Sequence, residues 1–406
     1  MGRFRVYVKP FDDAGAYVAD WTEVTEDIDM SGLSQMKQSL DNNEYDIGVF
    51  KNANVTLTLM NFNGTYSDVG SPGSIFKYRR SNSLVKITWE IMHHDVICGF
   101  CTCGEVALSE EVDAFVGLLD DTGLKQDADE QNIQFKVLGK ESILGEVIVP
   151  FADIAAGDTF EEILFTILNQ TAITNLLTVS ALNISCSVNS VTDSVAALQN
   201  KTVREALSLL LLYSNAVLYI ESDTIHVAPR TATVDIKYTF YGQGALGGME
   251  NINDLSDYRI GLNRLLNFMT WKNTTLSSED PSSITSFGYK KKEIETSLIT
   301  DNTKRQAILD SIKDEFKNPK REMIIKAPID YDTIALKVLD RVVIDYPNIP
   351  INNDADIPLW DLAVWDTAVY PYEVLPIAIE SEANFKILSR DIDPANQELS
   401  FYVREI

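Results

Sequence analysis

The residue types best suited to metal binding gather in one short stretch, IMHHDVICGFCTCGEV, at positions 91–106. This stretch holds two of the three histidines and three of the four cysteines of the chain. Both side-chain types are ligands for zinc, so a zinc site is the first hypothesis to test. The five candidate ligands are His93, His94, Cys98, Cys101 and Cys103.

The elements that carry these residues argue against a shared metal ion. Period-two alternation up to residue 91 predicts a strand, and the residues after the histidines predict a returning strand, with the histidines at the hairpin tip. At ~3.3 Å per residue, Cys101 and Cys103 lie roughly 20 to 30 Å from that tip, whereas zinc–ligand bonds are about 2 Å long. Cys98 points to the opposite face from the other two cysteines. We therefore expect no metal and no cofactor, and cysteines that act as small buried hydrophobic residues. The alternative is that two cysteines on one face contribute to a site when a second chain approaches them.

Motifs of the common catalytic classes do not occur. The sequence contains no GxxxxGK[ST], HExxH or GxSxG, and LGKESILG at 138–145 lacks the upstream glycine of a phosphate-binding loop. Adjacent acids such as Glu110/Glu111 and Asp120/Asp121 are expected by chance among 60 acidic residues. We therefore expect no enzyme, and a polysaccharide hydrolase that uses an acid pair is a weak alternative.

Composition and charge limit further the class of protein to which this chain can belong. The chain has 406 residues, is 45% hydrophobic and carries a net charge of −26 from 60 acidic and 34 basic residues. This length predicts more than one core. The excess of acidic residues argues against specific nucleic-acid binding. An acidic wall would, however, let DNA pass without sticking. The simpler interpretation of the negative charge is that it keeps the protein soluble. The opening MGRFRVYVKPF has no signal-like apolar run, and the apolar run at 206–213 is too short to span a bilayer. We expect a protein that folds in the cytosol with reduced cysteines and is not bound to a membrane.

Hydrophobic periodicity predicts the elements that build the fold. Thr159 with Glu162 and Thr202 with Glu205 are capping-box pairs, each ahead of an apolar helical segment. A third helix is predicted over 302–317, before Pro319. The tail predicts a β-hairpin around the turn DPANQ at 393–397. Alternating segments predict further strands at 4–10, 54–62, 83–91, 132–139, 216–222, 223–230, 233–242, 265–273, 321–328 and 340–347.

These elements predict an α+β fold that is mainly β, with two β-rich, barrel-like regions on either side of a small α+β region. We divide the chain into a first barrel at 1–149, an α+β domain at 150–230, and a second barrel at 231–350 that contains the helix 302–317. Residues 351–406 supply an aromatic loop and the closing hairpin of the second barrel.

The block SLDNNEYDIGVFKNANVTLTLMNFNGTYSD resembles the start of the first barrel in the central hub proteins of phage baseplates and tail tips. The GF of CGFCTCGEV resembles a strand of these hubs that returns from a hairpin. LLLLYSNAVLYIESDTIHVAPR is similar to their middle domain. DYRIGLNRLLNFMTWKN, with SSITSFGYKKKEIETSLITDNTKRQAIL, resembles the entry to the second barrel. The last 47 residues, which begin WDLAVWDTAVYPYEVLP, resemble the closing strands of these hubs.

The resemblance implies a structural virion protein with two tube-like β-barrel domains per chain. Three chains would form a pseudo-sixfold ring that caps the tail tube and encloses the channel through which DNA leaves. The expected partners are further copies of the chain, most simply as a homotrimer, the tail tube or a distal tail protein, and a spike or fibre protein. The expected location is the virion tail, after assembly in the host cytoplasm. Some hubs carry a lytic domain, and this chain ends just after the final barrel strands, so we expect any hydrolase to be a separate protein.

One segment is suited to a subunit contact. Residues 357–376 combine aromatic and aliphatic side chains in a loop bounded by prolines, and Trp and Tyr are common anchors of protein interfaces. We expect it to contact a partner or, equally, to fold over its own barrel as a core plug. The candidate contact residues are Trp360, Trp365, Tyr370 and Tyr372.

A carbohydrate-binding tail adhesin is the alternative function from a different class. Trp21, Trp89 and Trp271 lie on or near predicted strands, where exposed rings could stack on sugars. Trp89 alternates with aliphatic residues, however, and this pattern favours burial over sugar contact.

Overall fold

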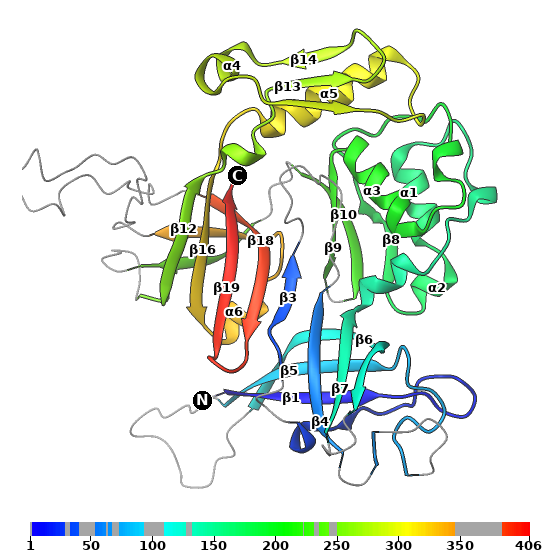
Figure 1. Ribbon diagram of the computed structural model, residues 1–406, viewed down its shortest axis with the longest axis vertical. Helices are drawn as coiled ribbons and strands as arrows, with labels where there is room; N and C mark the ends of the chain where they lie inside the picture. The colour runs from blue at the N-terminus through cyan, green and yellow to red at the C-terminus, as the bar shows by residue number, and fades with distance from the viewer. Residues whose placement is uncertain are drawn as a thin grey trace, which may run out of the picture.

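The computed structural model describes residues 2–28, 33–39, 53–61, 64–66, 73–92, 109–126, 132–221, 223–230, 235–242, 250–345 and 384–406 (Figure 1). These residues form a mainly β fold with helices, which confirms the predicted fold class. One large sheet contains 13 strands, and two smaller sheets contain three strands each. None of the helices in this part of the chain is long and apolar enough to cross a membrane.

The large sheet draws its strands from both ends of the sequence. The N-terminal strands are β1 (Gly2–Lys9), β2 (Thr22–Glu23), β3 (Met36–Ser39), β4 (Asn54–Met60), β5 (Leu84–Met92), β6 (Ser109–Gln126) and β7 (Asn132–Gly139). The C-terminal strands are β11 (Ile236–Tyr241), β12 (Asp254–Ile260), β16 (Arg321–Pro328), β17 (Arg341–Asp345), β18 (Asn384–Asp393) and β19 (Glu398–Glu405). The strand β6 was not predicted from the sequence, whereas the terminal hairpin β18–β19 around residues 394–397 was.

Two halves of this sheet meet at β3. The first half runs β4-β7-β6-β5-β1-β2, and the second runs β12-β16-β19-β18, with β17 and β11 continuing from β18. Met36 to Ser39 of β3 pair with Ile392 to Ser389 of β18, and Lys37 also pairs with Asn54 of β4. This short strand therefore joins two sets of strands that lie far apart in the sequence (Figure 1).

Hydrogen bonds bring the outer strands of each half toward each other. In the first half, Ile28 forms an antiparallel bridge with Leu59 of β4, just after β2 and the 3-10 helix η1 (Thr25–Asp27). In the second half, the Asn251 backbone N–H donates to Tyr241 of β11, and the N–H of Asn253 donates to Lys326 of β16. These contacts curve each half of the sheet toward its own outer strands. The two tube-like barrels stay a prediction.

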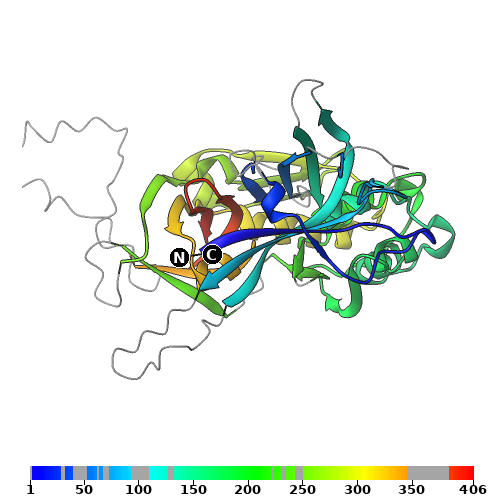
Figure 2. The ribbon, with the colours of Figure 1, turned by 90° about the horizontal axis from the view of Figure 1, so that it is seen from below.

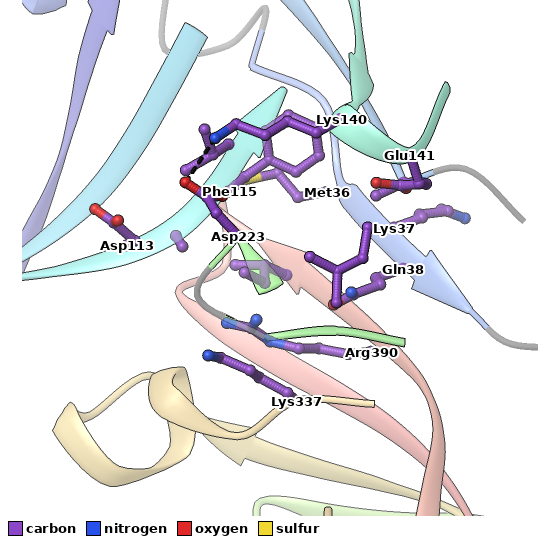
Figure 3. A pocket seen from close by; sticks show the side chains of 15 residues that line it. Met36, Lys37, Gln38, Asp113, Phe115, Lys140, Glu141, Asp223, Lys337 and Arg390 are labelled. Atoms are coloured by element: carbon purple, nitrogen blue, oxygen red, sulfur yellow. Dashed lines mark hydrogen bonds and ion pairs between the residues drawn. The ribbon is translucent and has the colours of Figure 1, made fainter. Parts of the chain in front are cut away.

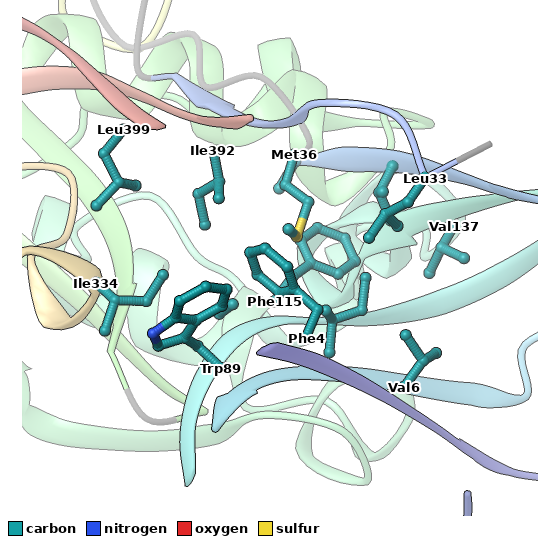
Figure 4. Packing of buried hydrophobic residues seen from close by; sticks show 14 of the residues in the cluster. Phe4, Val6, Leu33, Met36, Trp89, Phe115, Val137, Ile334, Ile392 and Leu399 are labelled. Atoms are coloured by element: carbon teal, nitrogen blue, oxygen red, sulfur yellow. The ribbon is translucent and has the colours of Figure 1, made fainter. Parts of the chain in front are cut away.

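The first hydrophobic core is shared by both halves of the large sheet. Inward-facing residues alternate with polar ones, as in β4, where Val55, Leu57 and Leu59 are buried. Trp89 packs edge-on against Phe4 at a ring-centroid distance of 4.6 Å. Figure 4 shows side chains of the first half, such as Trp89, on the same core as Ile392 and Leu399 of the second half. The two halves are therefore stabilised by a common apolar interior.

The second core combines the middle of the chain with residues 266–316. Its elements are α1 (Phe160–Leu168), α2 (Thr171–Thr174), α3 (Val203–Tyr213), α5 (Asn302–Phe316), the sheet of β8 (Thr178–Ile184), β9 (Ala216–Glu221) and β10 (Thr224–Pro229), and the sheet of β13 (Phe268–Trp271), β14 (Ser277–Glu279) and β15 (Lys291–Ile294). The short helix α4 (Pro281–Phe287) follows β14 in the chain. Both predicted capping boxes are present, and the helix predicted over 302–317 is α5.

The helix α5 shares the second core with the middle segment of the chain, residues 144–227. Its buried residues Ile308, Leu309 and Ile312 belong to the same cluster as Phe160 of α1 and Trp271 of β13. The predicted division groups this helix with the second barrel, and that division stays a prediction. In the view from below, the helices of the middle segment (green) lie on the side away from the C-terminal strands (orange and red), and blue and cyan strands run between them (Figure 2).

Candidate functional site

The residues predicted to contact a partner lie outside the described residues. Trp360, Trp365, Tyr370 and Tyr372 fall within 346–383, so their contacts stay a prediction. The candidate metal ligands fall within 93–108, which is also outside the described part: His93, His94, Cys98, Cys101 and Cys103.

Within the residues that the structure does describe, no group of three or more His, Cys, Asp or Glu side chains is placed to hold a metal ion. The cysteine Cys186 is a free thiol, and burial raises its pKa to about 12. A thiol with so high a pKa is almost entirely protonated near neutral pH, so it is a poor nucleophile and a poor ligand.

A buried carboxylate organises the outer side of the first half of the large sheet. Arg3 and Arg5 of β1 alternate with the core residues Phe4 and Val6, so both point to the outer side, where Glu90 of β5 lies directly opposite Arg3. Arg3 Nε donates to Glu90 Oε2 at 2.5 Å, and Arg5 donates through Nη2 to Oε1 at 2.7 Å and through Nε to Oε2 at 2.8 Å. These charged hydrogen bonds lower the pKa of Glu90 to about 2 and raise the pKa of Arg5.

A second buried carboxylate lies among arginines on the outer side of the second half of the large sheet. Glu322 of β16 is 1% exposed and lies opposite Arg404 of β19 on one side and Arg259 of β12 on the other. Its Oε2 accepts hydrogen bonds from Arg259 Nε at 3.2 Å and from the Tyr402 hydroxyl at 2.5 Å. Arg264 Nε lies 3.5 Å and Arg404 Nε 3.7 Å from Oε1.

The two glutamates therefore sit in equivalent surroundings. Each lies on the outer side of a strand whose inner side belongs to the shared core, and each faces an arginine on the adjacent antiparallel strand. The charged hydrogen bonds from the arginines lower the pKa of Glu90, whereas Glu322 accepts through Oε2 and, among the described residues, has Arg264 and Arg404 near Oε1 without a hydrogen bond to it. The arrangement suits a rigid outer wall and is a poor one for general acid–base catalysis.

A cavity of about 360 Å³ lies where β3 and β18 meet the first half of the sheet and the turn between β9 and β10. We call it the junction pocket. Figure 3 shows Lys337 and Arg390 on one side of the pocket, Lys140 paired with Asp223 on another with Asp113 beyond them, and Glu141 on the same side as Lys37. The pocket thus brings together residues from the N-terminal, middle and C-terminal parts of the chain.

Several charges of the junction pocket have partners within it. Lys140 Nζ lies 2.7 Å from Asp223 Oδ2, which ties η3 (Lys140–Gly145) to the β9–β10 turn. Glu141 accepts a hydrogen bond from the backbone N–H of Ala53 at 2.5 Å, and burial raises its pKa. Arg390 donates through Nη2 to the carbonyl of Ile334 at 2.6 Å, and burial lowers its pKa to about 10. The segment LGKESILG is therefore a turn that links two parts of the fold.

The tryptophans that the structure describes do not form a sugar-binding platform. Trp89 is 3% exposed and Trp271 is 2% exposed, each within a hydrophobic core. The Trp21 ring is half-buried, and the ammonium groups of Lys9 and Lys86 lie 5.8 and 5.3 Å from its centre.

Sequence reasoning missed the two buried glutamates. The available signal was a Glu at an outward position of a strand, as in WEI at 89–91 and REM at 321–323. That signal is weak, because outward glutamates are ordinarily solvated, and only the strand pairing places arginines opposite them.

Comparison with known proteins identifies the fold. No family model matches the chain, and no curated protein matches it in sequence. A 43 kDa tail protein of prophage MuSo2 from Shewanella oneidensis superposes with a TM-score of 0.52 at 13% identity, over 99% of this chain and 97% of that one. A tail protein from Neisseria meningitidis MC58 gives a TM-score of 0.55 at 11% identity, over 100% and 96%. This chain therefore has the fold of phage tail proteins along its whole length, as the resemblance of its sequence blocks predicted.

Proposed function

We propose that this chain is a structural protein of a phage tail tip or baseplate, and that it acts as a hub whose ring caps the tail tube and lines the DNA exit channel. The observation that carries the proposal is the likeness in fold to two phage tail proteins over nearly the full length of all three chains. The two halves of the large sheet, joined edge to edge by β3, supply two β-rich bodies per chain, as a pseudo-sixfold ring of three chains requires.

The charge of the chain supports passage of DNA without binding. With a net charge of −26, the molecule repels phosphate groups, and a ring built from it would present an acidic wall to DNA in its channel. Specific or non-specific DNA binding depends instead on clusters of Lys and Arg that neutralise phosphates.

Sheet edges support assembly with neighbouring subunits. Among the strands that the structure describes, β2 and β12 end the path of the large sheet, and each pairs along one edge only. Unpaired strand edges are sites where another chain can add hydrogen bonds. We propose that copies of this chain assemble as a homotrimer, with a tail tube or distal tail protein on one side and a spike or fibre protein on the other, in the virion tail.

The burial of Trp89 and Trp271 disfavours the carbohydrate-binding alternative, because rings inside a core cannot stack on sugars. Glu90 and Glu322 likewise give no support to a hydrolase, because both side chains are buried among arginines and are not available to a substrate. We propose that the chain has no enzymatic activity of its own.

Native mass spectrometry of the purified chain, with and without its tail-tube protein, tests the proposal. We expect a trimer, and electron microscopy should then show a ring with a central hole. A chain that stays monomeric at micromolar concentration even with the tube protein present would contradict the hub role. Binding on a glycan array would support the adhesin instead.

A variant pair tests the proposed contact segment. Replacing Trp360 and Trp365 by Ala should weaken the trimer while leaving the circular dichroism spectrum unchanged. Tyr289→Ala is the control, because this side chain is 70% exposed and its ring contacts Phe268 of β13, which belongs to a small sheet and not to the large one. If the double variant loses its fold, the segment is a core plug and the contact hypothesis is wrong.

A further inference from the structure

A second cavity, of about 220 Å³, lies beside the C-terminal end of β19 and between the two cores. Its walls come from β18 and β19 of the large sheet, and from β9 and the end of α5 of the second core (Figure 1). We call it the basic cavity after five lining residues: Arg230, Arg264, Lys320, Lys386 and Arg404.

The basic cavity concentrates positive charge on a strongly acidic protein. Its acidic lining residues are Glu315 and Glu405, and each is already paired. Lys320 Nζ lies 3.1 Å from Glu315 Oε1, and Arg321 holds Glu405 with two contacts of 2.9 and 2.6 Å. Five basic residues therefore line the cavity against two acids, whereas the chain as a whole carries −26.

The most deeply buried cation of this cavity keeps an unsatisfied donor. Arg404 is 8% exposed, and within the described part of the chain its Nε has no hydrogen-bond partner. The nearest carboxylate oxygen, Glu322 Oε1, is 3.7 Å from this atom, and the guanidinium lies 5.1 Å from the centre of the Phe316 ring. A buried N–H of a charged group without an acceptor is costly, and the residue that carries it is one of those that line the cavity.

Lys386 experiences the same excess of charge. Its Nζ donates to the backbone carbonyl of Arg230 at 2.9 Å. Burial lowers its pKa to about 8, Glu315 opposes this shift, and the neighbouring cations Lys320, Arg230 and Arg404 each add a smaller lowering effect. Like charges held together in a partly desolvated site destabilise one another unless an anion lies between them.

We propose that the basic cavity binds a small oxyanion of the phosphate class. The guanidinium of Arg404 and the ammonium of Lys386 approach from adjacent strands of the large sheet, and Lys320 and Arg230 approach from the second core. Guanidinium and ammonium groups together match the several oxygens of a tetrahedral anion. The bound anion would bridge the two cores and stabilise their junction. This site stands independently of the proposed ring.

Thermal unfolding of the full chain at pH 7 tests the site. At equal ionic strength, saturating sodium phosphate should raise Tm by about 2 °C or more over sodium chloride, because a ligand of the native state stabilises it by mass action. Lys386→Gln should lose this rise. The control is Lys326→Gln, which removes a lysine paired with Glu398 on the same sheet, away from the cavity, and should keep the rise.

Calorimetry with inorganic phosphate gives a second measurement in case Lys386→Gln fails to fold. Lys320→Gln should weaken phosphate binding about 10-fold, the loss expected from one charged hydrogen bond. An equal phosphate response in wild type and in both cavity variants would overturn the proposal. A rise in Tm with malonate but not with phosphate would overturn the assignment to the phosphate class.

Discussion

Replacing Glu90 by Gln tests whether the buried carboxylate stabilises the first half of the large sheet through its charge. The amide keeps the shape of the side chain and removes the negative charge that Arg3 and Arg5 surround at 2.5 to 2.8 Å. We expect the variant to be less stable than the wild type at pH 7, and the difference to disappear in acid.

The magnitude follows from the pKa of Glu90. Its fall from 4.5 to about 2 corresponds to about 3 kcal/mol at 1.36 kcal/mol per pH unit. Solvent reaches the site because the side chain of Arg3 is 56% exposed, and screening reduces the expected loss to about 1–2 kcal/mol. Because folding lowers this pKa, the stabilisation is fully present above pH 4.5 and is lost as the pH falls toward 2.

The assay is urea unfolding at pH 7.0, 5.0 and 3.5, with hydrogen exchange of the β1 and β5 amides to localise the loss. The difference between wild type and Glu90→Gln should be largest at pH 7.0 and should narrow at pH 3.5. Glu23→Gln is the matched control, because this exposed carboxylate lies 3.4 Å from the same Arg5 and should change stability by less than about 0.5 kcal/mol. A difference that is constant across the pH range would refute the reasoning, since it would arise from packing and not from charge.

Three further outcomes are expected. Glu322→Ala should cost about 3–5 kcal/mol in urea unfolding, because it leaves buried arginines without their carboxylate, and a cost below 1 kcal/mol would show that solvent reaches them. Cys186 should react with iodoacetamide at pH 8 at least about 100-fold more slowly in the folded chain than in urea, measured by peptide mass spectrometry, and equal rates would disprove its protonated, buried state. Thr202→Ala should destabilise α3 by about 1 kcal/mol in hydrogen exchange, and unchanged protection would mean that the capping box with Glu205 adds nothing measurable.

Local patterns in the sequence predicted most elements, because these patterns act over a few residues. Alternation places Val55, Leu57 and Leu59 on the inner side of one strand, and the structure buries all three. The capping box of Thr159 and Glu162 forms as the spacing of the two residues predicts. The strand β6 was missed because its sequence, SEEVDAFVGLLDDTGLKQ, does not alternate regularly over its length.

The candidate sites were much harder to predict than the elements. No local pattern indicates that Glu90 will face Arg3, since that depends on the register between β1 and β5. The basic cavity draws on residues from 230 to 404, and its excess of positive charge is hidden in a sequence whose overall charge is −26. The proposed contact residues Trp360 and Trp365 lie outside the described residues, so that hypothesis rests on composition alone.

The sequence by itself determined the mainly β class, the helices α1, α3 and α5 with the capping boxes of α1 and α3, the terminal hairpin and the acidic character of the chain. Only the tertiary structure decided that β3 joins β18 and that α5 packs on the middle segment. The physical reason is that hydrophobic periodicity specifies which face of an element is buried but not which partner covers it. The choice of partner depends on shape, register and chain connectivity over the whole molecule, and the sites between elements depend on it in turn.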